Sequence, residues 1–206
     1  WLPLAELYGR LGDVERLQRV VEETLDGLQD LADRCSLRVT LARALMDRED
    51  RTADAVAILE EVLVEDPDEP NAQAMLFAHL DRTGDRERLV ELLERRIDIA
   101  IDREDHAGIK TTALELVRRL EGHDRFAALD VLRRALRFVN DDVDLLGALH
   151  SRLSDEEDAH ERAELAEMLI RVEAPASAAE RALGLARTYD GMGDGEAALR
   201  ALKLGT

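Results

Sequence analysis

Apolar residues recur along the chain at a helical spacing. Ala55, Ile58, Leu59, Val62 and Leu63 stand at positions i, i+3, i+4, i+7 and i+8, which places them on one face of a helix with 3.6 residues per turn. The same spacing returns at Ala128, Val131, Leu132, Ala135 and Leu136. No segment shows the period-two alternation, bounded by turn residues, that a half-buried strand requires. The pattern therefore predicts an all-α fold without a β-sheet.

Polar turns recur as well. The hexapeptide GDVERL at residues 12–17 returns as GDRERL at residues 84–89, about 72 residues later. A second kind of turn lies between and beyond these copies, at residues 49–51, 122–124 and 193–194. The period thus divides into two helix hairpins of about 34 and about 38 residues.

Helix starts are indicated by acidic and hydroxyl residues. Asp13, Asp85, Asp124 and Asp194 follow turns, where a carboxylate can accept free N–H groups of the next helix. Residues 154–157 have the spacing of a capping box. Twelve helices are predicted, at residues 2–11, 13–27, 29–48, 51–65, 70–82, 85–103, 105–121, 124–139, 142–153, 156–173, 176–192 and 194–204.

Six hairpins follow from these helices, at approximately residues 1–28, 29–66, 70–103, 105–139, 142–173 and 176–204. A lone hairpin cannot bury its apolar faces, whereas stacked hairpins share a continuous core. Because long linkers are absent, we expect a single domain over residues 1–206. Apolar residues make up 46% of the chain with only one Trp, two Tyr and three Phe, so the core should consist of Leu, Ala, Val and Ile.

The first and last hairpins carry a known signature. Trp1, Leu4, Ala5, Tyr8, Gly12 and Asp13 resemble the tetratricopeptide pattern W-x2-L-[GA]-x2-Y followed by a Gly-Asp turn. A second match consists of Leu185, Ala186, Tyr189, Gly193, Asp194 and Ala198. The whole chain resembles the tetratricopeptide repeat family, which implies a right-handed α-α superhelix. It also implies a concave groove, lined by the first helix of each hairpin, that contacts peptides or helices of another protein.

The resemblance also suggests groove residues. The candidates for ligand binding are Glu6, Arg43, Asn71, Asp81, Arg118 and Arg187. The second, fourth and sixth hairpins each present an arginine at the groove position, so a row of arginines could bind the carboxylates of an acidic segment. In the alternative, each of these arginines pairs with an Asp or Glu on a neighbouring helix.

The charge of the chain restricts the partners. A formal charge of −18, from 46 acidic and 28 basic residues, would repel phosphate backbones, so nucleic-acid binding is not expected. No apolar stretch long enough to span a membrane and no signal peptide is visible, and we expect a cytoplasmic protein without membrane partners. All but two of the basic residues are arginine, as in GC-rich bacterial genomes, and the chain begins at Trp1. We therefore expect an internal fragment of a longer bacterial repeat protein, with self-association through uncapped terminal hairpins.

Motifs for catalysis or metal binding are missing from the sequence. The five histidines stand singly, without metal-ligand spacing, and His150 is the one expected to be partly buried. Cys35 has no histidine nearby in sequence and is expected to be a neutral core residue. No glycine-rich phosphate loop is present, and acidic clusters such as residues 65–69 lack the glycine and glutamate that shape a calcium loop. We expect no enzyme activity, no catalytic residues, no metal and no cofactor.

Function follows from architecture and surface. The leading hypothesis is a scaffold or adaptor module that binds a protein or peptide segment in the concave groove. One alternative is a structural spacer or self-assembly segment of a large repeat protein. The other is a regulatory region of an enzyme whose catalytic domain lies outside this chain.

Overall fold

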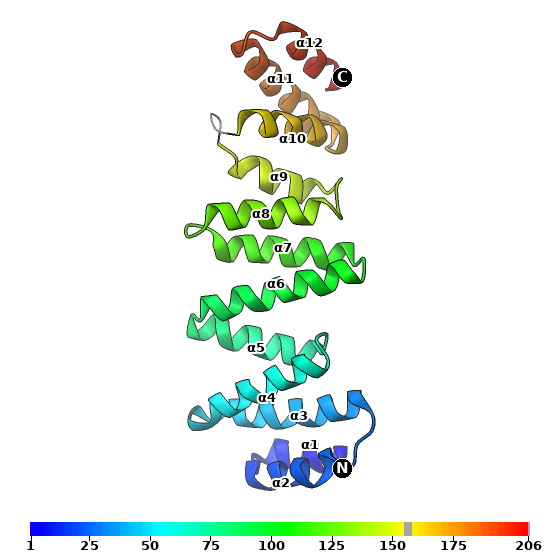
Figure 1. Ribbon diagram of the computed structural model, residues 1–206, viewed down its shortest axis with the longest axis vertical. Helices are drawn as coiled ribbons and strands as arrows, with labels where there is room; N and C mark the ends of the chain where they lie inside the picture. Colours follow the sequence, from blue (N-terminus) through cyan, green and yellow to red (C-terminus); the bar gives the residue numbers. More distant parts are fainter. Residues whose placement is uncertain (155–157, 206) are drawn as a thin grey trace. The chain divides into compact units, whose positions relative to one another are not determined.

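The fold consists of helices joined by short turns (Figure 1). The computed structural model describes residues 1–154 and 158–205, and within these ranges it contains twelve α-helices, one short 3-10 helix and no strand. The elements are α1 (Leu2–Leu11), α2 (Val14–Leu25), α3 (Leu31–Met46), η1 (Glu49–Arg51), α4 (Thr52–Glu65), α5 (Pro70–Thr83), α6 (Arg86–Asp102), α7 (His106–Leu120), α8 (Arg125–Leu136), α9 (Val143–Arg152), α10 (Ala159–Val172), α11 (Pro175–Gly191) and α12 (Gly195–Leu204). The all-α prediction is confirmed, and predicted helix ends differ from the observed ones by about three residues at most.

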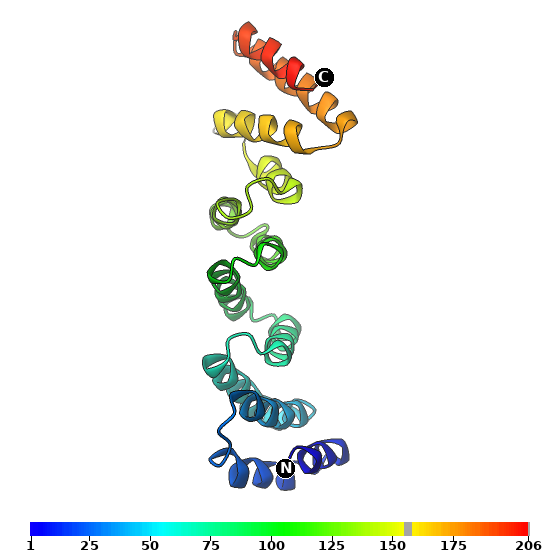
Figure 2. The same ribbon diagram turned by 90° about the vertical axis from the view of Figure 1, so that its right-hand side faces the viewer.

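Two compact units are formed by the contacts within the chain, Trp1–Leu89 and Val90–Thr206. In the first unit α1 packs on α2 and α3, and α3 also packs on α4 and α5. In the second unit α7 packs on α8 and α9, and α10 packs on α9, α11 and α12. Figure 2 shows α11 and α12 side by side as one hairpin. The single domain and the right-handed superhelix stay predictions.

The predicted capping aspartates cap their helices. The carboxylate of Asp13 accepts the backbone N–H of Arg16 at 3.1 Å, and Asp124 and Asp194 accept N–H groups at 2.9 Å in the same way. Before Asp13 and Asp194 stand glycines with φ of 68° and 79°, a left-handed conformation that glycine adopts without steric cost. The repeated Gly-Asp pair therefore stops one helix and starts the next. Glu157 of the predicted capping box lies outside the described residues.

The core contains small and medium aliphatic side chains, as predicted. Within the described ranges every buried apolar residue is Leu, Ala, Val or Ile, with the exception of Cys35. No aromatic side chain of the described residues is fully buried: Tyr189 packs against the edge of the core, and Phe126 is 73% exposed. In α12, Ala197 and Ala198 are buried because α11 packs against them. Leu202 and Leu204 are 40% and 38% exposed, and self-association through the terminal hairpins stays a prediction.

Candidate binding groove

One face of α3 forms the floor of a groove in the first unit. The floor residues repeat at intervals of three and four, which places them on a single face of the helix: Ala32, Cys35, Ser36, Val39, Thr40, Arg43, Ala44 and Asp47. Several of them are small, and the Thr40 hydroxyl donates to the Ser36 carbonyl oxygen at 2.8 Å. From Ala32 to Asp47 the floor is about 22 Å long at the helical rise of 1.5 Å per residue. That length matches about six residues of an extended peptide.

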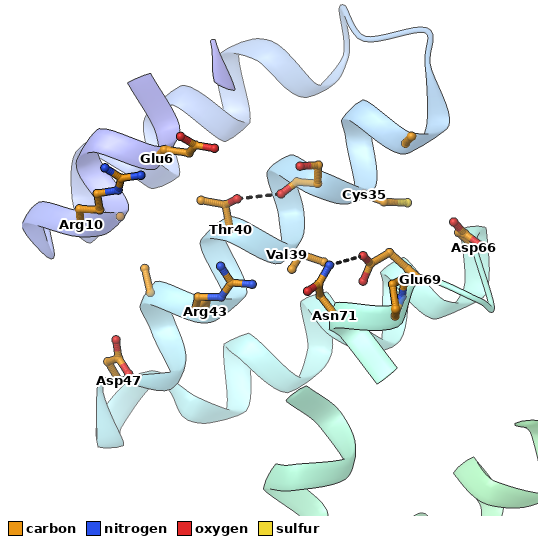
Figure 3. Close-up of a pocket in the computed structure, with 15 residues that line it drawn as sticks. Glu6, Arg10, Cys35, Val39, Thr40, Arg43, Asp47, Asp66, Glu69 and Asn71 are labelled. Carbon is orange, nitrogen blue, oxygen red and sulfur yellow. Dashed lines mark hydrogen bonds between the residues drawn. The ribbon is translucent and has the colours of Figure 1, made fainter. Parts of the chain in front are cut away.

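The walls of the groove come from α1 and from the start of α5 (Figure 3). Glu6, Gly9 and Arg10 of α1 form one wall, and residues 66 and 69–71 form the other. The open groove has a volume of about 880 Å³, within the range of about 300 to 1,000 Å³ that is typical of ligand sites. We call this site, with the residues of its floor and walls, the α3 groove.

Four charged side chains of the α3 groove have no partner. Arg10, Arg43, Glu6 and Asp47 make no ion pair and no side-chain hydrogen bond with the residues that the structure describes. All four side chains line the groove (Figure 3). The groove therefore offers free donors and free acceptors to a ligand.

The opposite face of α3 carries arginines that are paired, unlike Arg43 in the groove. Arg34 and Arg38 bind the carboxylate of Glu65, at the end of α4, at 3.1 Å and 2.5 Å. The hydrogen bond from Arg38 holds the pKa of Glu65 below its ordinary value, against the opposing effect of partial burial. These arginines are used to attach α4 to α3, whereas Arg43 is not used in this way.

Acidic groups gather at the end of the groove near the start of α3. Glu69 accepts the Ala72 backbone N–H as the N-cap of α5, and its other oxygen accepts the side-chain amide of Asn71 at 2.9 Å. Asp66 lies beside it in the wall (Figure 3). Arg10, Arg43 and Asp47 lie toward the end of α3 instead. One end of the groove is thus acidic and the other carries both signs of charge.

Cys35 lies in the groove floor but is only 1% exposed. Burial raises the pKa of its thiol, and the carboxylates of Asp66 and Glu65 raise it further. The thiol therefore stays protonated at neutral pH and is a poor nucleophile. This agrees with the interpretation of Cys35 as a neutral core residue.

Three of the six predicted groove residues come together. Glu6, Arg43 and Asn71 all line the α3 groove. Arg118 and Arg187 lie in the second unit, where Arg118 binds Glu115 of its own helix at 2.8 Å rather than a neighbouring helix. Asp81 lies in the last turn of α5, outside the α3 groove.

Sequence reasoning missed four charged residues of the groove, Arg10, Asp47, Asp66 and Glu69, of which the first two had a signal in the sequence. Arg10 stands four residues after Glu6, and Asp47 stands four residues after Arg43. Residues four apart share a helix face, so extending each groove position by one turn would have found both.

Among residues 1–154 and 158–205 no group of three or more His, Cys, Asp or Glu side chains is placed to hold a metal ion. No helix within the same ranges has the length and apolar character needed to cross a membrane.

Comparisons with known proteins give likenesses in fold. No family model matches the chain, and no curated protein matches it. Among solved structures, the chain is similar to YrrB, described as a TPR protein with an unusual peptide-binding site, at 16% identity over 93% of this chain and 91% of that one, with a TM-score of 0.47. Two structures of MamA are similar at 17% and 18% identity, over 78% and 82% of this chain and 90% of each of theirs, with TM-scores of 0.45 and 0.46.

Proposed function

We propose that the α3 groove binds an extended segment of another protein, and that the chain serves as a binding module. The observation that carries this proposal is the set of unpaired charges in a groove of about 880 Å³ lined by α1, α3 and α5. A spacer gains nothing from unpaired charges held in a hollow, because pairing them would stabilise the fold. A binding module needs them, because ligand groups can then replace water as their partners.

The charge distribution indicates the kind of segment. Arg10 and Arg43 can each bind a carboxylate through two N–H groups. Asp66 and Glu69 favour a cationic group at the other end of the groove. The proposed ligand is therefore an extended segment of about six residues that carries an acidic side chain and, farther along, a basic one.

Selection from a display library of random peptides tests the proposal. We expect the 206-residue chain to enrich peptides with this charge pattern. The double variant Arg10→Ala/Arg43→Ala should bind them at least about tenfold more weakly, because hydrogen bonds to charged groups contribute about 1.5 to 3 kcal/mol each. Asp66→Asn should weaken the binding of the same peptides, because it removes a negative charge from the acidic end of the groove.

A matched control removes two positive charges from the same unit outside the groove. Arg19→Ala/Arg86→Ala changes α2 and α6, and neither residue lines the α3 groove or pairs with a described residue. Equal losses in both double variants, or no enriched peptide at all, would favour the spacer. The triple variant Arg43→Ala/Arg118→Ala/Arg187→Ala tests the predicted row of arginines, which stays a proposal together with Asp81.

A further inference from the structure

Three leucines of α1 lie on one exposed face of the helix. Leu4, Leu7 and Leu11 are 43%, 50% and 67% exposed, and their i, i+3, i+7 spacing puts them in one row along α1. The helix packs on α2 and α3, with the fully buried Ala5 on the other side, so the row points away from both neighbours. Large apolar side chains exposed together are typical of interaction surfaces. We call Leu4, Leu7 and Leu11 the leucine row.

Two charged residues flank the leucine row along one side. Glu6 and Arg10 are exposed and lie next to the row around the helix, one turn apart. Glu followed by Arg at i+4 is a spacing that favours an ion pair on a helix surface. Glu6 and Arg10 nevertheless make no ion pair with each other or with any other residue that the structure describes. Both charges therefore remain available to a second molecule.

The order of leucines and charges along α1 is self-complementary. In a two-fold contact between two copies of α1, the helices run antiparallel, and residues at equal distances from the axis meet. The middle of the leucine row lies between residues 7 and 8, and the middle of the Glu6–Arg10 spacing lies at residue 8. These two midpoints differ by only about 0.8 Å along the helix. One axis therefore places Leu4 near Leu11 of a second copy. The same axis places Glu6 near Arg10 of that copy.

A parallel arrangement of two α1 helices fits less well. Glu6 would then meet Glu6 and Arg10 would meet Arg10, and like charges facing each other across an interface repel. The formal charge of −18 also opposes the association of two copies. At physiological salt, however, exposed charges farther apart than about 8 Å are largely screened. The charges beside the leucine row therefore decide the orientation of the contact.

We propose that α1 joins two copies of this chain through the leucine row and two reciprocal Glu6–Arg10 ion pairs. Three leucines per copy make a contact smaller than the interfaces of stable complexes, so the dimer is weak, with a Kd on the order of 100 µM. The inference does not rest on the binding of a segment in the α3 groove. Because Glu6 and Arg10 also line that groove, a second copy and a bound segment compete for these two charges.

Sedimentation equilibrium of the 206-residue chain, without any ligand, tests the proposal at about 0.15 M salt. We expect a reversible monomer–dimer equilibrium at protein concentrations between about 10 and 500 µM, which bracket the expected Kd. A chain that stays monomeric throughout this range would overturn the proposal.

Two leucine variants locate the contact. Leu7→Glu puts a carboxylate close to the axis and should weaken the dimer at least about tenfold, and far-UV circular dichroism checks that the variant is folded. Leu199→Glu is the matched control, because Leu199 is 61% exposed on α12, and it should leave the dimer unchanged. A dimer that survives Leu7→Glu, or that is lost equally in Leu199→Glu, would place the contact elsewhere and overturn the proposal.

Reversal of the charges tests the arrangement of the two copies. Glu6→Arg and Arg10→Glu should each weaken the dimer about tenfold, because each variant leaves like charges facing each other across the axis. The double variant Glu6→Arg/Arg10→Glu presents opposite charges again and should recover the Kd of the wild type. Damage to the fold of α1 would not be repaired by the second substitution. If the double variant is as weak as the single ones, the two-fold contact through Glu6 and Arg10 is wrong.

Discussion

The α3 groove in the first unit and a hollow of about 280 Å³ in the second unit, lined by α9, α10 and α11 and called here the α10–α11 pocket, are built from the same kind of element but hold their arginines differently. In the α3 groove, Arg10 and Arg43 have no carboxylate partner among the described residues. In the α10–α11 pocket, Arg181 is bound along one edge by the carboxylate of Glu173, whose side chain is 10% exposed. Both hollows exist because small residues face each other across helix surfaces.

The difference concerns the cost of binding. An unpaired, exposed arginine can meet ligands of several shapes, but it loses rotamer freedom when it binds, at about 0.5 to 1.5 kcal/mol per side chain. An arginine fixed by a buried partner has lost that freedom during folding. The unpaired arginines of the α3 groove can therefore adapt to ligands of several shapes, whereas Arg181 presents its remaining N–H groups in one orientation.

The largest effect should come from the core beneath the α3 groove. Leu37 lies on the buried side of α3 and is fully buried, so Leu37→Ala should lower the free energy of unfolding by about 2 to 5 kcal/mol. Urea unfolding followed by far-UV circular dichroism measures the loss. Leu31→Ala is the control on the same helix, because Leu31 is 38% exposed, and its effect should stay near 0.5 kcal/mol. If both variants lost a similar free energy of unfolding, α3 would not have one buried face and one exposed face.

Breaking the ion pair between Arg181 and Glu173 should give the next largest loss of stability. Glu173→Gln removes the charged partner of Arg181 and should lower the free energy of unfolding by about 1.5 to 3 kcal/mol, the range for hydrogen bonds to charged groups. Glu180→Gln on α11 is the control, since Glu180 is exposed and unpaired within the described ranges. A double-mutant cycle with Arg181→Gln isolates the pair. A coupling energy near zero would mean that Glu173 does not fix Arg181.

Acid should weaken the attachment of α4 to α3. The pKa of Glu65 is lowered in the folded chain by the hydrogen bond from Arg38, so the unfolded chain binds the proton more readily. The stabilisation is therefore complete above the ordinary carboxyl pKa of about 4.5 and is lost as the pH falls below it. At pH 7 we expect Glu65→Gln to cost about 1 kcal/mol, as for a partly exposed ion pair.

The test is a comparison of urea midpoints for wild type and Glu65→Gln between pH 7 and acid. The difference between them should shrink below about pH 4.5. Glu61→Gln, on the exposed side of α4, should show no such convergence. A difference that stays constant with pH would exclude the pair with Arg38 as its source.

Local signals in the sequence account for most of the fold. The helix predicted at residues 70–82 ends one residue later because Gly84 takes a φ of 70° and terminates it. The capping aspartates bind backbone N–H groups only three residues farther along the chain. Such features depend on neighbours in sequence, so periodicity and turn chemistry find them.

Pairing of side chains could not be predicted in the same way. The sequence places Arg38 and Arg43 on one helix, yet only Arg38 reaches Glu65. The α10–α11 pocket depends on Gly184 facing Ala163 and Ala166 of another helix, which is a matter of tertiary packing. Arg118 is the exception, because its partner Glu115 lies one turn away on α7 and pairs at this spacing can be predicted from the sequence.

The smallest effect should come from the arginine that the groove leaves unpaired. Arg43 is exposed and has no ion pair with any described residue, so Arg43→Ala should change the free energy of unfolding by no more than about 0.5 kcal/mol. Arg38→Ala is the control, because the same substitution on the other face of α3 breaks the pair with Glu65 and should cost about 1 kcal/mol. A stability loss in Arg43→Ala equal to that in Arg38→Ala would show that Arg43 supports the fold. If Arg43→Ala leaves stability unchanged, a loss of peptide binding in the groove variants reports the contact with the ligand, because the scaffold beneath it is intact.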